Sequence, residues 1–221
     1  MEQDIRYMRD PHIIERNRKL SEKIIKGLES RNMLGYYAET RDDALKIALD
    51  LIPEGSSVSW GGALSMWQIG LKQALLEGNY EVYNRDQAMG DRKESRKYEM
   101  AAMSCDYYIC STNAMTEDGI LVNIDGIGNR VAAISYGTRN IIMIVGMNKV
   151  ANDVDAAVSR ARNVAAPTNA QRFNIDTPCK VTGSCANCKS DHCICSHMLI
   201  TRFCMLKNRI KVILVNDDLG F

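Results

Sequence analysis

Hydrophobic residues near the start of the chain recur with the spacing of helices. Asp10 and Pro11 indicate a helix start, a capping residue followed by proline at the first helical position, and apolar residues then recur three and four apart as far as Leu28. A second helix is expected over 41–51, with Thr40 as its capping residue. We therefore expect residues 1–52 to form an N-terminal region that is mainly helical.

Beyond this region, apolar strand patterns alternate with helical patterns. The run at 140–145 is rich in β-branched residues, as is typical of a buried parallel strand. Two other apolar runs, 121–123 and 131–134, flank a glycine turn. Strands are expected at 34–38, 56–60, 80–83, 107–110, 140–145 and 210–215, and helices at 65–77, 92–104 and 153–165, the last ended by Pro167. This alternation predicts a single α/β domain over 1–221, with a mostly parallel sheet, helices on both faces and a cysteine-rich loop before the last strand.

The composition argues against several classes of protein. The chain of 221 residues has 28 Lys and Arg against 27 Asp and Glu, so its net charge is +1 and no broad basic surface points to nucleic acid. Its hydrophobic fraction of 46% is typical of a globular protein with its own core. No run reaches the roughly 18 apolar residues of a membrane span, and the polar start, Met1 to Asp4, does not resemble a signal peptide. We therefore expect a cytoplasmic protein without a membrane span.

A predicted strand that ends in two glycines is a candidate anion site. Gly61 and Gly62 follow the strand at 56–60 and precede a helix that begins near Ser65. Glycines let backbone N–H groups approach a ligand closely, and a helix N-terminus carries partial positive charge, so a phosphate or carboxylate would meet these groups and the Ser65 hydroxyl. The third glycine of a dinucleotide-binding motif is missing, and a plain strand-to-helix turn explains the sequence equally well.

Polar residues are concentrated in the loop 111–130, which follows another predicted strand. Ligands of open α/β sheets bind beyond the carboxyl ends of strands, so this loop is the second candidate site. Glu117 is a candidate base or nucleophile, and Arg130 is a candidate clamp for a carboxylate or phosphate. A hairpin turn at Asp125 with an Asx hydrogen bond is the simpler alternative for that residue. The predicted catalytic residues are Glu117, Asn123 and Asp125, and the predicted anion- or substrate-binding residues are Gly61, Gly62, Ser65, Asn113, Asn129 and Arg130.

Cysteine is the one unusual component of the sequence. Six of the eight cysteines lie between positions 179 and 204, at Cys179, Cys185, Cys188, Cys193, Cys195 and Cys204. In a reducing compartment, crowded cysteines with a C-x2-C step indicate a metal or iron–sulfur site rather than disulfides. Four thiolates suit a [4Fe–4S] cluster and a tetrahedral zinc equally, and a metal-free reduced loop is the alternative. Cys105 and Cys110 are expected in the core, where free cysteine packs as a small hydrophobic residue.

Three stretches of the sequence resemble one known family, the lactate-utilisation (LUD) domain proteins. They are VSWGGALSMWQIGL at 58–71, the region 105–172 with the motif STNAMTEDGILVNIDGIGNRVAA, and a tail, TPCKVTGSCANCKS, that is similar to the cysteine-bearing branch of the family. The resemblance implies the fold of ribose-phosphate isomerase, glucosamine-phosphate deaminase and the CoA-transferases. It also implies an association with the oxidation of lactate to pyruvate, in which LUD proteins act beside iron–sulfur subunits.

The resemblance also implies which cysteines bind a metal. Cys179, Cys185, Cys188 and Cys195 match the cysteines of that branch, whereas Cys193 stands where the branch has another residue. The first four are therefore the expected ligands, and whether Cys193 or Cys195 is the fourth ligand stays open.

These features support three functional hypotheses. The leading one is a cytosolic, metal-dependent enzyme whose pocket lies between the two candidate loops, with the cysteine segment (176–205) folded over it and carrying a [4Fe–4S] cluster. Its substrate would be a small carboxylate or a phosphate-bearing metabolite. The second is a non-catalytic or electron-relay subunit of a lactate-oxidising complex, with an iron–sulfur protein as partner. The third is a binding module stabilised by zinc. Assembly into a homo-oligomer is compatible with each of them.

Overall fold

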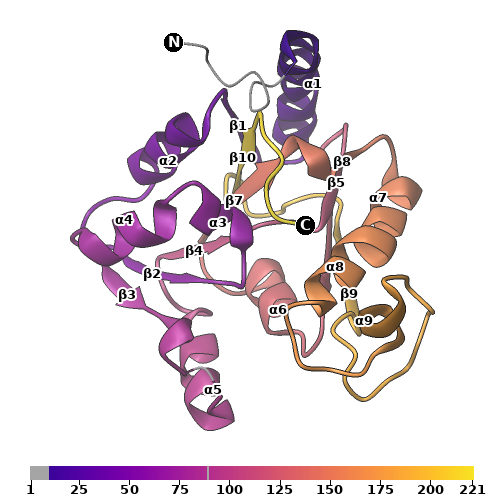
Figure 1. Cartoon of the computed structure of the whole chain (residues 1–221). Helices are drawn as coiled ribbons and strands as arrows, with labels where there is room; N and C mark the ends of the chain where they lie inside the picture. Colours follow the sequence, from indigo (N-terminus) through magenta and orange to yellow (C-terminus); the bar gives the residue numbers. More distant parts are fainter. Residues whose placement is uncertain (1–9, 89) are drawn as a thin grey trace, which may run out of the picture.

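The computed structural model describes residues 10–88 and 90–221, which form two sheets with helices packed around them (Figure 1). The first nine residues of the predicted N-terminal region, with the polar start of the chain, lie outside this part. The larger sheet has six strands, all parallel, in the order β1-β10-β7-β4-β2-β3. Their bounds are β1 Leu34–Ala38, β10 Ile210–Val215, β7 Asn140–Gly146, β4 Tyr107–Cys110, β2 Ser57–Trp60 and β3 Glu81–Tyr83. The predicted α/β class with a mostly parallel sheet is therefore confirmed.

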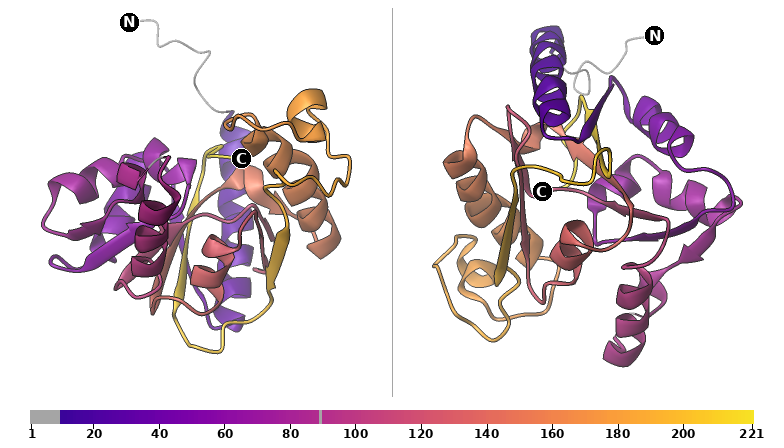
Figure 2. Two further views of the ribbon diagram at one scale, coloured as in Figure 1. Left: turned by 90° about the horizontal axis from the view of Figure 1, so that it is seen from below. Right: turned by 180° about the vertical axis from the view of Figure 1, so that it is seen from behind.

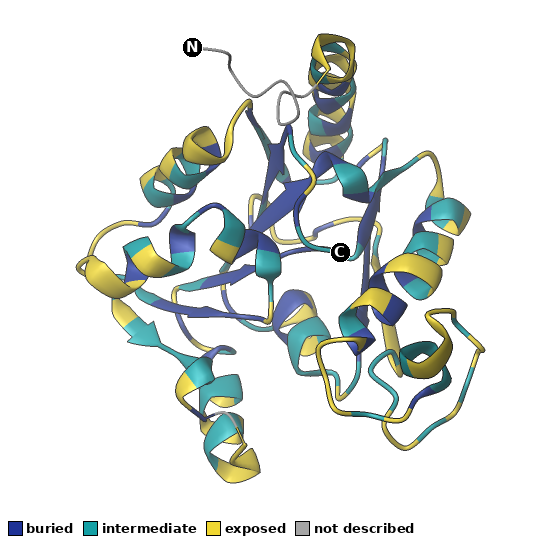
Figure 3. Cartoon of the chain, in the orientation of Figure 1, coloured by how far each residue is buried: buried dark blue, intermediate teal, exposed yellow. Residues whose placement is uncertain are grey.

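Successive residues of a strand point to opposite faces of the sheet, and in these strands both sets are apolar. Helices therefore cover both faces of the six-stranded sheet. In β7, Ile142 and Ile144 face a core shared with α2, α3 and α4, whereas Ile141 and Met143 face a second core shared with α1 and α6. Figure 2 shows these helices on opposite sides of the sheet, and Figure 3 shows the central strands as the most buried layer. The helices are α1 Pro11–Ser30, α2 Arg41–Asp50, α3 Leu64–Gln68, α4 Leu71–Glu77, α5 Arg92–Ala101, α6 Asn129–Ser135, α7 Val154–Arg160, α8 Ala166–Ala170 and α9 Pro178–Thr182.

The helix starts predicted from capping residues are confirmed. The Asp10 carboxylate accepts a hydrogen bond from the backbone N–H of His12 at 2.7 Å. Thr40 and Asp43 form a capping box at the start of α2, in which each side chain accepts a hydrogen bond from the other's backbone N–H. The helix expected over 65–77 is divided into α3 and α4 at Gly70, whose φ of +77° favours glycine.

A second sheet of four short strands packs beside the larger one, and the sequence pattern did not predict it. Its order is β8-β5-β6-β9, with β6 antiparallel to both β5 and β9. Its outer face packs against α7 and α8 through small residues, among them Ala114, Ala157 and Ala161. The bounds are β8 Val150–Ala151, β5 Ala114–Thr116, β6 Leu121–Asp125 and β9 His197–Thr201. The sheet therefore extends the fold on the side that carries the loop 111–130.

Two local predictions differ from the structure. The apolar run 131–134 lies in helix α6 and not in the second arm of a hairpin. The prediction that Pro167 ends the last helix is wrong, because a π-helical turn over Ala161–Ala165 leads directly into α8. Pro167 therefore lies inside a continuous run of helical residues, just after the π-helical turn. Among the described residues, no helix is both long and apolar enough to cross a membrane.

Candidate functional site

Buried polar groups are gathered where the central strands of the larger sheet end. The chain leaves β4 at Ser111 and leaves β7 in a short turn that ends at Lys149. The Lys149 amine donates a hydrogen bond to Ser111 Oγ at 2.9 Å, and Ser111 Oγ donates to the Ile144 carbonyl at 2.6 Å. Ser65, at the start of α3, donates to the same carbonyl at 2.9 Å. These contacts lie at the carboxyl edge of a parallel sheet, where such folds bind ligands.

Arg130 connects this edge to the smaller sheet. Its Nη1 donates to the Ser111 carbonyl and to Asn123 Oδ1, both at 3.0 Å, and its Nη2 donates to Asn113 Oδ1 at 2.7 Å. Asn123 is fully buried, and its Nδ2 has no hydrogen-bond partner within the described residues. Arg130 therefore fixes the amide oxygens of the loop 111–130 and leaves one buried N–H donor of Asn123 without an acceptor.

Asp125 positions Arg130 and begins helix α6. One carboxylate oxygen accepts from the backbone N–H of Gly128 at 3.1 Å, and the other accepts from the backbone N–H of Arg130 at 3.0 Å. The second oxygen also lies 3.8 Å from Arg130 Nε. The expected Asx interaction is present, but it starts a helix and does not close a hairpin. In this geometry Asp125 holds Arg130, and both of its oxygens are occupied.

Lys149 is almost entirely buried, with 3% of its surface exposed, and it forms no ion pair with the described residues. Burial lowers the pKa of its amine to about 7, and the positive charges of Arg160 and Arg130 act in the same direction. Arg160, the last residue of α7, donates through Nε to the Asn148 carbonyl at 2.9 Å and through Nη1 to the Asn113 carbonyl at 2.6 Å. We call Lys149, Arg130, Arg160, Ser111 and Asn123 together the Lys149 site.

The last residues of the chain cover the Lys149 amine. The Leu219 backbone N–H donates to Asn148 Oδ1 at 3.1 Å, and the Gly220 backbone N–H donates to Gln68 Oε1 at 2.7 Å. A Cβ atom built on Gly220 would lie 3.0 Å from Lys149 Nζ. Figure 1 shows this end of the chain at the edge of the larger sheet, between α3 and the smaller sheet. Segment 217–221 therefore shields the site from solvent.

Four of the cysteines approach one another in the cysteine segment. Cys193 Sγ lies 3.5 Å from Cys195 Sγ. Burial, together with the neighbouring Cys193, Cys185 and Cys188, raises the pKa of Cys195 to about 12. Burial opposes ionisation of Cys193 as well, yet hydrogen bonds from Cys195, Ser196 and Cys188 lower its pKa overall. Within 10–88 and 90–221, no three His, Cys, Asp or Glu side chains are arranged so that they could hold a metal ion.

The group of thiols differs from the expected ligand set in one member. Cys193 faces Cys195, whereas Cys179, in α9, contacts the Thr177 hydroxyl at 3.4 Å. The segment also packs on the candidate loop, because a Cβ on Gly126 would lie 3.2 Å from the Cα of Ile194. Its exposed part forms the edge of the molecule beside α8 and β9 (Figure 1).

Comparison with known proteins identifies the family. A model of the LUD domain matches residues 21–215. The chain belongs to the LUD domain family. The fold of this LUD domain is similar to the crystal structure of a DUF162 family protein from Deinococcus radiodurans, with a TM-score of 0.50 and 13% sequence identity over 90% of this chain and 98% of that one. At that identity the likeness shows the fold alone. No curated protein matches the sequence significantly.

The LUD domain brings together only part of the predicted site. Asn113, Asn123, Asp125 and Arg130 form one network, as described above. Glu117 lies in the turn between β5 and β6, at the other end of the smaller sheet, where it accepts a hydrogen bond from Lys23 Nζ at 2.6 Å. The structure therefore does not place Glu117 beside the other predicted catalytic residues.

The glycine loop and Asn129 have different surroundings from those expected. A Cβ on Gly61 would lie 2.9 Å from the Tyr108 hydroxyl and 3.3 Å from Arg130 Cδ, so the close approach at this glycine is to side chains of the protein. Gly62 borders open space, and the Ser65 hydroxyl is used by the Ile144 carbonyl. Asn129 donates to Glu99 Oε1 at 3.4 Å, in a separate pocket.

Lys149 and Arg160 are the residues that the sequence reasoning missed. The signal was available for Lys149, because it follows the strongest predicted strand by only a few residues and so lies beyond a carboxyl end. Arg160 comes from a helix two elements later. Only the packing of α7 on the smaller sheet brings it to the same site.

Proposed function

We propose that this LUD-domain protein is an enzyme that binds a small carboxylate or a phosphate-bearing metabolite at the Lys149 site. The observation that carries this proposal is an excess of buried donors over acceptors. Lys149 has no acidic partner among the described residues, and Asn123 Nδ2 has no acceptor there. A buried donor or charge without a partner is costly, so an anion that accepts from both groups would bind favourably.

The two arginines support the same ligand chemistry. Arg130 is held by Asp125, which balances its charge, but no carboxylate forms an ion pair with Arg160 in the described part of the chain. Arg160 Nη2 makes no hydrogen bond there either. Arginine binds carboxylates and phosphates through paired donors, so Arg160 and Lys149 would hold the anionic group together.

Lys149 would also move a proton. An amine with a pKa of about 7 is present in both protonation states near neutral pH, which suits a general acid or base. Ser111 fixes the amine by the hydrogen bond described above. A bound anion would favour the charged amine, so ligand binding and protonation of Lys149 would be coupled. Entry of a ligand would require segment 217–221 to move away from the amine.

A ligand-binding assay with matched variants tests this proposal. Phosphate, pyruvate and lactate, each at up to 20 mM, are added to the wild-type protein, to Lys149→Met and to Lys46→Met, and the melting temperature is recorded. Lys46 is an exposed lysine of α2 and serves as the control. We expect at least one anion to stabilise the wild type and the control but not Lys149→Met. The proposal would be contradicted if an anion stabilised Lys149→Met as much as the wild type. It would also be contradicted if none of the three anions stabilised the wild type.

We further propose that the cysteine segment holds a [4Fe–4S] cluster, with zinc as the alternative. Thiolates are the ligands that both groups use, and here four thiols lie close enough to shift one another's pKa. They belong to a segment with little apolar core of its own. Cys185, Cys188 and Cys195 would be ligands of either the cluster or zinc. The fourth ligand would be Cys193 or Cys179. A cluster with four protein ligands supplies electron transfer, a cluster with an open iron supplies a Lewis acid, and zinc supplies stability.

Metal analysis of two single variants tests this part without reference to activity. The protein is purified without oxygen, and iron, sulfide and zinc are quantified in the wild type, Cys179→Ser and Cys193→Ser. A cluster predicts about four irons per wild-type chain and loss of most of them in one of the two variants. About one zinc per chain, without iron, would show that the segment binds zinc and not a cluster. Neither metal in the wild type would refute metal binding.

One observation favours the electron-relay subunit as a second function. The cysteine segment lies at the edge of the molecule, and Cys185, Cys188, Cys193 and Cys195 are each partly exposed. A redox centre near the surface suits transfer to another protein, for which an iron–sulfur partner in the cytoplasm would be required. Co-purification of such a partner, together with an isolated chain that turns over no candidate substrate, would support this function over the enzyme.

A further inference from the structure

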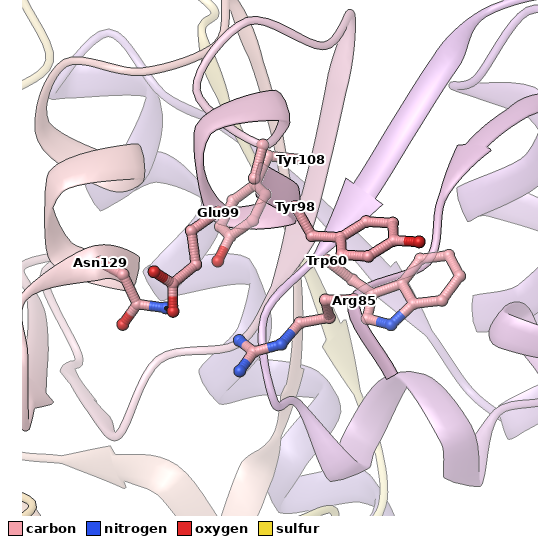
Figure 4. A pocket seen from close by; sticks show the side chains of 7 residues that line it. Trp60, Arg85, Tyr98, Glu99, Tyr108 and Asn129 are labelled. Atoms are coloured by element: carbon pink, nitrogen blue, oxygen red, sulfur yellow. Dashed lines mark hydrogen bonds between the residues drawn. The ribbon is translucent and has the colours of Figure 1, made fainter. Parts of the chain in front are cut away.

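A small pocket beside Gly61 is lined by two charged side chains, Glu99 and Arg85, whose hydrogen bonds and ion pairs within the described residues are incomplete. It is formed by residues of β2, β4, α5 and α6 and by Arg85, which follows β3, and Figure 4 shows the side chains of Glu99, Asn129 and Arg85 turned toward a common space. The enclosed part measures about 10 Å³, and the pocket with its open mouth measures about 230 Å³. Its lining residues are Trp60, Arg85, Tyr98, Glu99, Ala102, Tyr108 and Asn129. We call it the Glu99 pocket.

Glu99 lines this space with a carboxylate that has one buried, unpaired oxygen. Its side chain is 7% exposed. Oε1 accepts from Arg92 Nη1 at 2.8 Å and from Asn129 Nδ2 at 3.4 Å, whereas the buried Oε2 has no partner among the described residues. Charged oxygens are seldom buried without a donor, because the lost hydration is not replaced. A donor that belongs to neither of these side chains is therefore expected at Oε2.

Arg85 presents the opposite charge to the same space. It follows β3 and points its guanidinium into the pocket (Figure 4), yet its side chain forms no ion pair or hydrogen bond with the described residues. Its charge acts on the Tyr108 hydroxyl, whose pKa is raised by burial and lowered in part by Arg130 and Arg85. Glu99 and Arg85 thus face one pocket without forming an ion pair with each other.

The pocket is distinct from the Lys149 site. Gly61, the Tyr108 side chain and the aliphatic part of Arg130 lie between the two, with the contacts at Gly61 given above. The guanidinium of Arg130 is directed to the other side, toward Ser111 and Asn123. Binding in the Glu99 pocket is therefore independent of the proposed function at Lys149.

We propose that the Glu99 pocket binds a free α-amino acid, with its ammonium group at Glu99 and its carboxylate at Arg85. The enclosed volume is that of about one water molecule, which matches an ammonium group and leaves the rest of the ligand in the mouth. An ammonium donates to a buried carboxylate by a charge-assisted hydrogen bond, and a guanidinium binds a carboxylate in the same way. Arg92, the other cation near Glu99, is 62% exposed and so balances its charge only weakly.

Fluorescence of Trp60 provides a direct assay, because this residue lines the pocket. The second tryptophan, Trp67, is removed by Trp67→Phe. Glycine is titrated to 100 mM, and glycolate, acetate and methylammonium are titrated in parallel. We expect glycine to give a saturable change. Glycolate and acetate lack the ammonium group and methylammonium lacks the carboxylate, so each should bind at least tenfold more weakly.

Two variants locate the binding, and a third controls for charge. Glu99→Gln and Arg85→Met are each expected to weaken glycine binding at least tenfold, whereas Arg96→Met, an exposed arginine of α5, leaves it unchanged. Circular dichroism confirms folding, and Arg85→Met serves if Glu99→Gln fails to fold. Equal binding of glycine and acetate would show an anion site at Arg85 alone and would overturn the proposal. So would no signal with glycine, or unchanged glycine binding in both pocket variants.

Discussion

Replacing Lys149 by methionine should stabilise the protein, and the gain should depend on pH. The pKa of this amine is about 7 in the folded protein and 10.5 in the unfolded chain. Between these values the unfolded chain carries one more proton, so the folded state becomes more stable as the pH rises from about 7 to 10.5. Below pH 7 both states are protonated, and the full cost of the buried charge remains. Methionine has a similar shape and carries no charge, so the Lys149→Met variant avoids this cost.

The magnitude follows from the difference of about 3.5 between the two pKa values. At about 1.4 kcal/mol for each pKa unit, burying Lys149 costs up to about 5 kcal/mol at pH 6, where the buried amine is charged, and about 2 kcal/mol at pH 9, where folding must deprotonate it. The hydrogen bond from Lys149 to Ser111 Oγ offsets about 1 kcal/mol of this, since the variant loses it. We therefore expect Lys149→Met to be more stable than the wild type by about 4 kcal/mol at pH 6 and by about 1 kcal/mol at pH 9.

Urea denaturation at pH 6, 7.5 and 9 measures these differences, with Lys46→Met as the exposed control. The change of about 3 kcal/mol between pH 6 and pH 9 is the diagnostic quantity, because it does not depend on how well methionine packs. A difference in stability that is the same at all three pH values would refute the reasoning. It would mean that Lys149 titrates alike in the folded and unfolded states.

Two further substitutions test individual contacts of the site. Asn123→Asp places a carboxylate beside Arg130 and near Lys149, so it should raise the pKa of the Lys149 amine and weaken binding of the anion at least tenfold; an isothermal titration that finds equal affinity would contradict this. Gly61→Ala should lower the free energy of unfolding by about 1–3 kcal/mol, because its Cβ would lie 2.9 Å from the Tyr108 hydroxyl, and combining it with Tyr108→Phe should restore part of the loss in a urea denaturation. No recovery in the double variant would show that the strain lies elsewhere.

The elements that the sequence predicted correctly carry strong local signals. Helix α1 has a cap and a long apolar face, and β7 is a continuous run of buried apolar residues. The smaller sheet lacks such signals. Its strand β5 has three residues, and β9 is half exposed and lies within the cysteine segment. Pairing with distant strands, and not local preference, makes these residues extended.

The site could be predicted only in part for a related reason. Asn113, Asn123, Asp125 and Arg130 are close in sequence, so the polar character of their loop indicated the network that the structure shows. Glu117 belongs to the same loop in sequence, but the antiparallel pairing of β5 with β6 carries it to the opposite end of the smaller sheet. Proximity in the sequence therefore identified the correct region, but it also selected Glu117, which lies apart from the network.

The central claim is that the buried Lys149 amine binds an anion. Titration of this amine tests the claim most directly. Lysine side chains labelled with ¹³C are followed by NMR from pH 5 to 11, and the Lys149 signal is assigned by its loss in Lys149→Met. We predict a pKa near 7 for the free protein and a higher value in the presence of the anion that stabilises it. A pKa near 10.5 that the anion leaves unchanged would contradict the account.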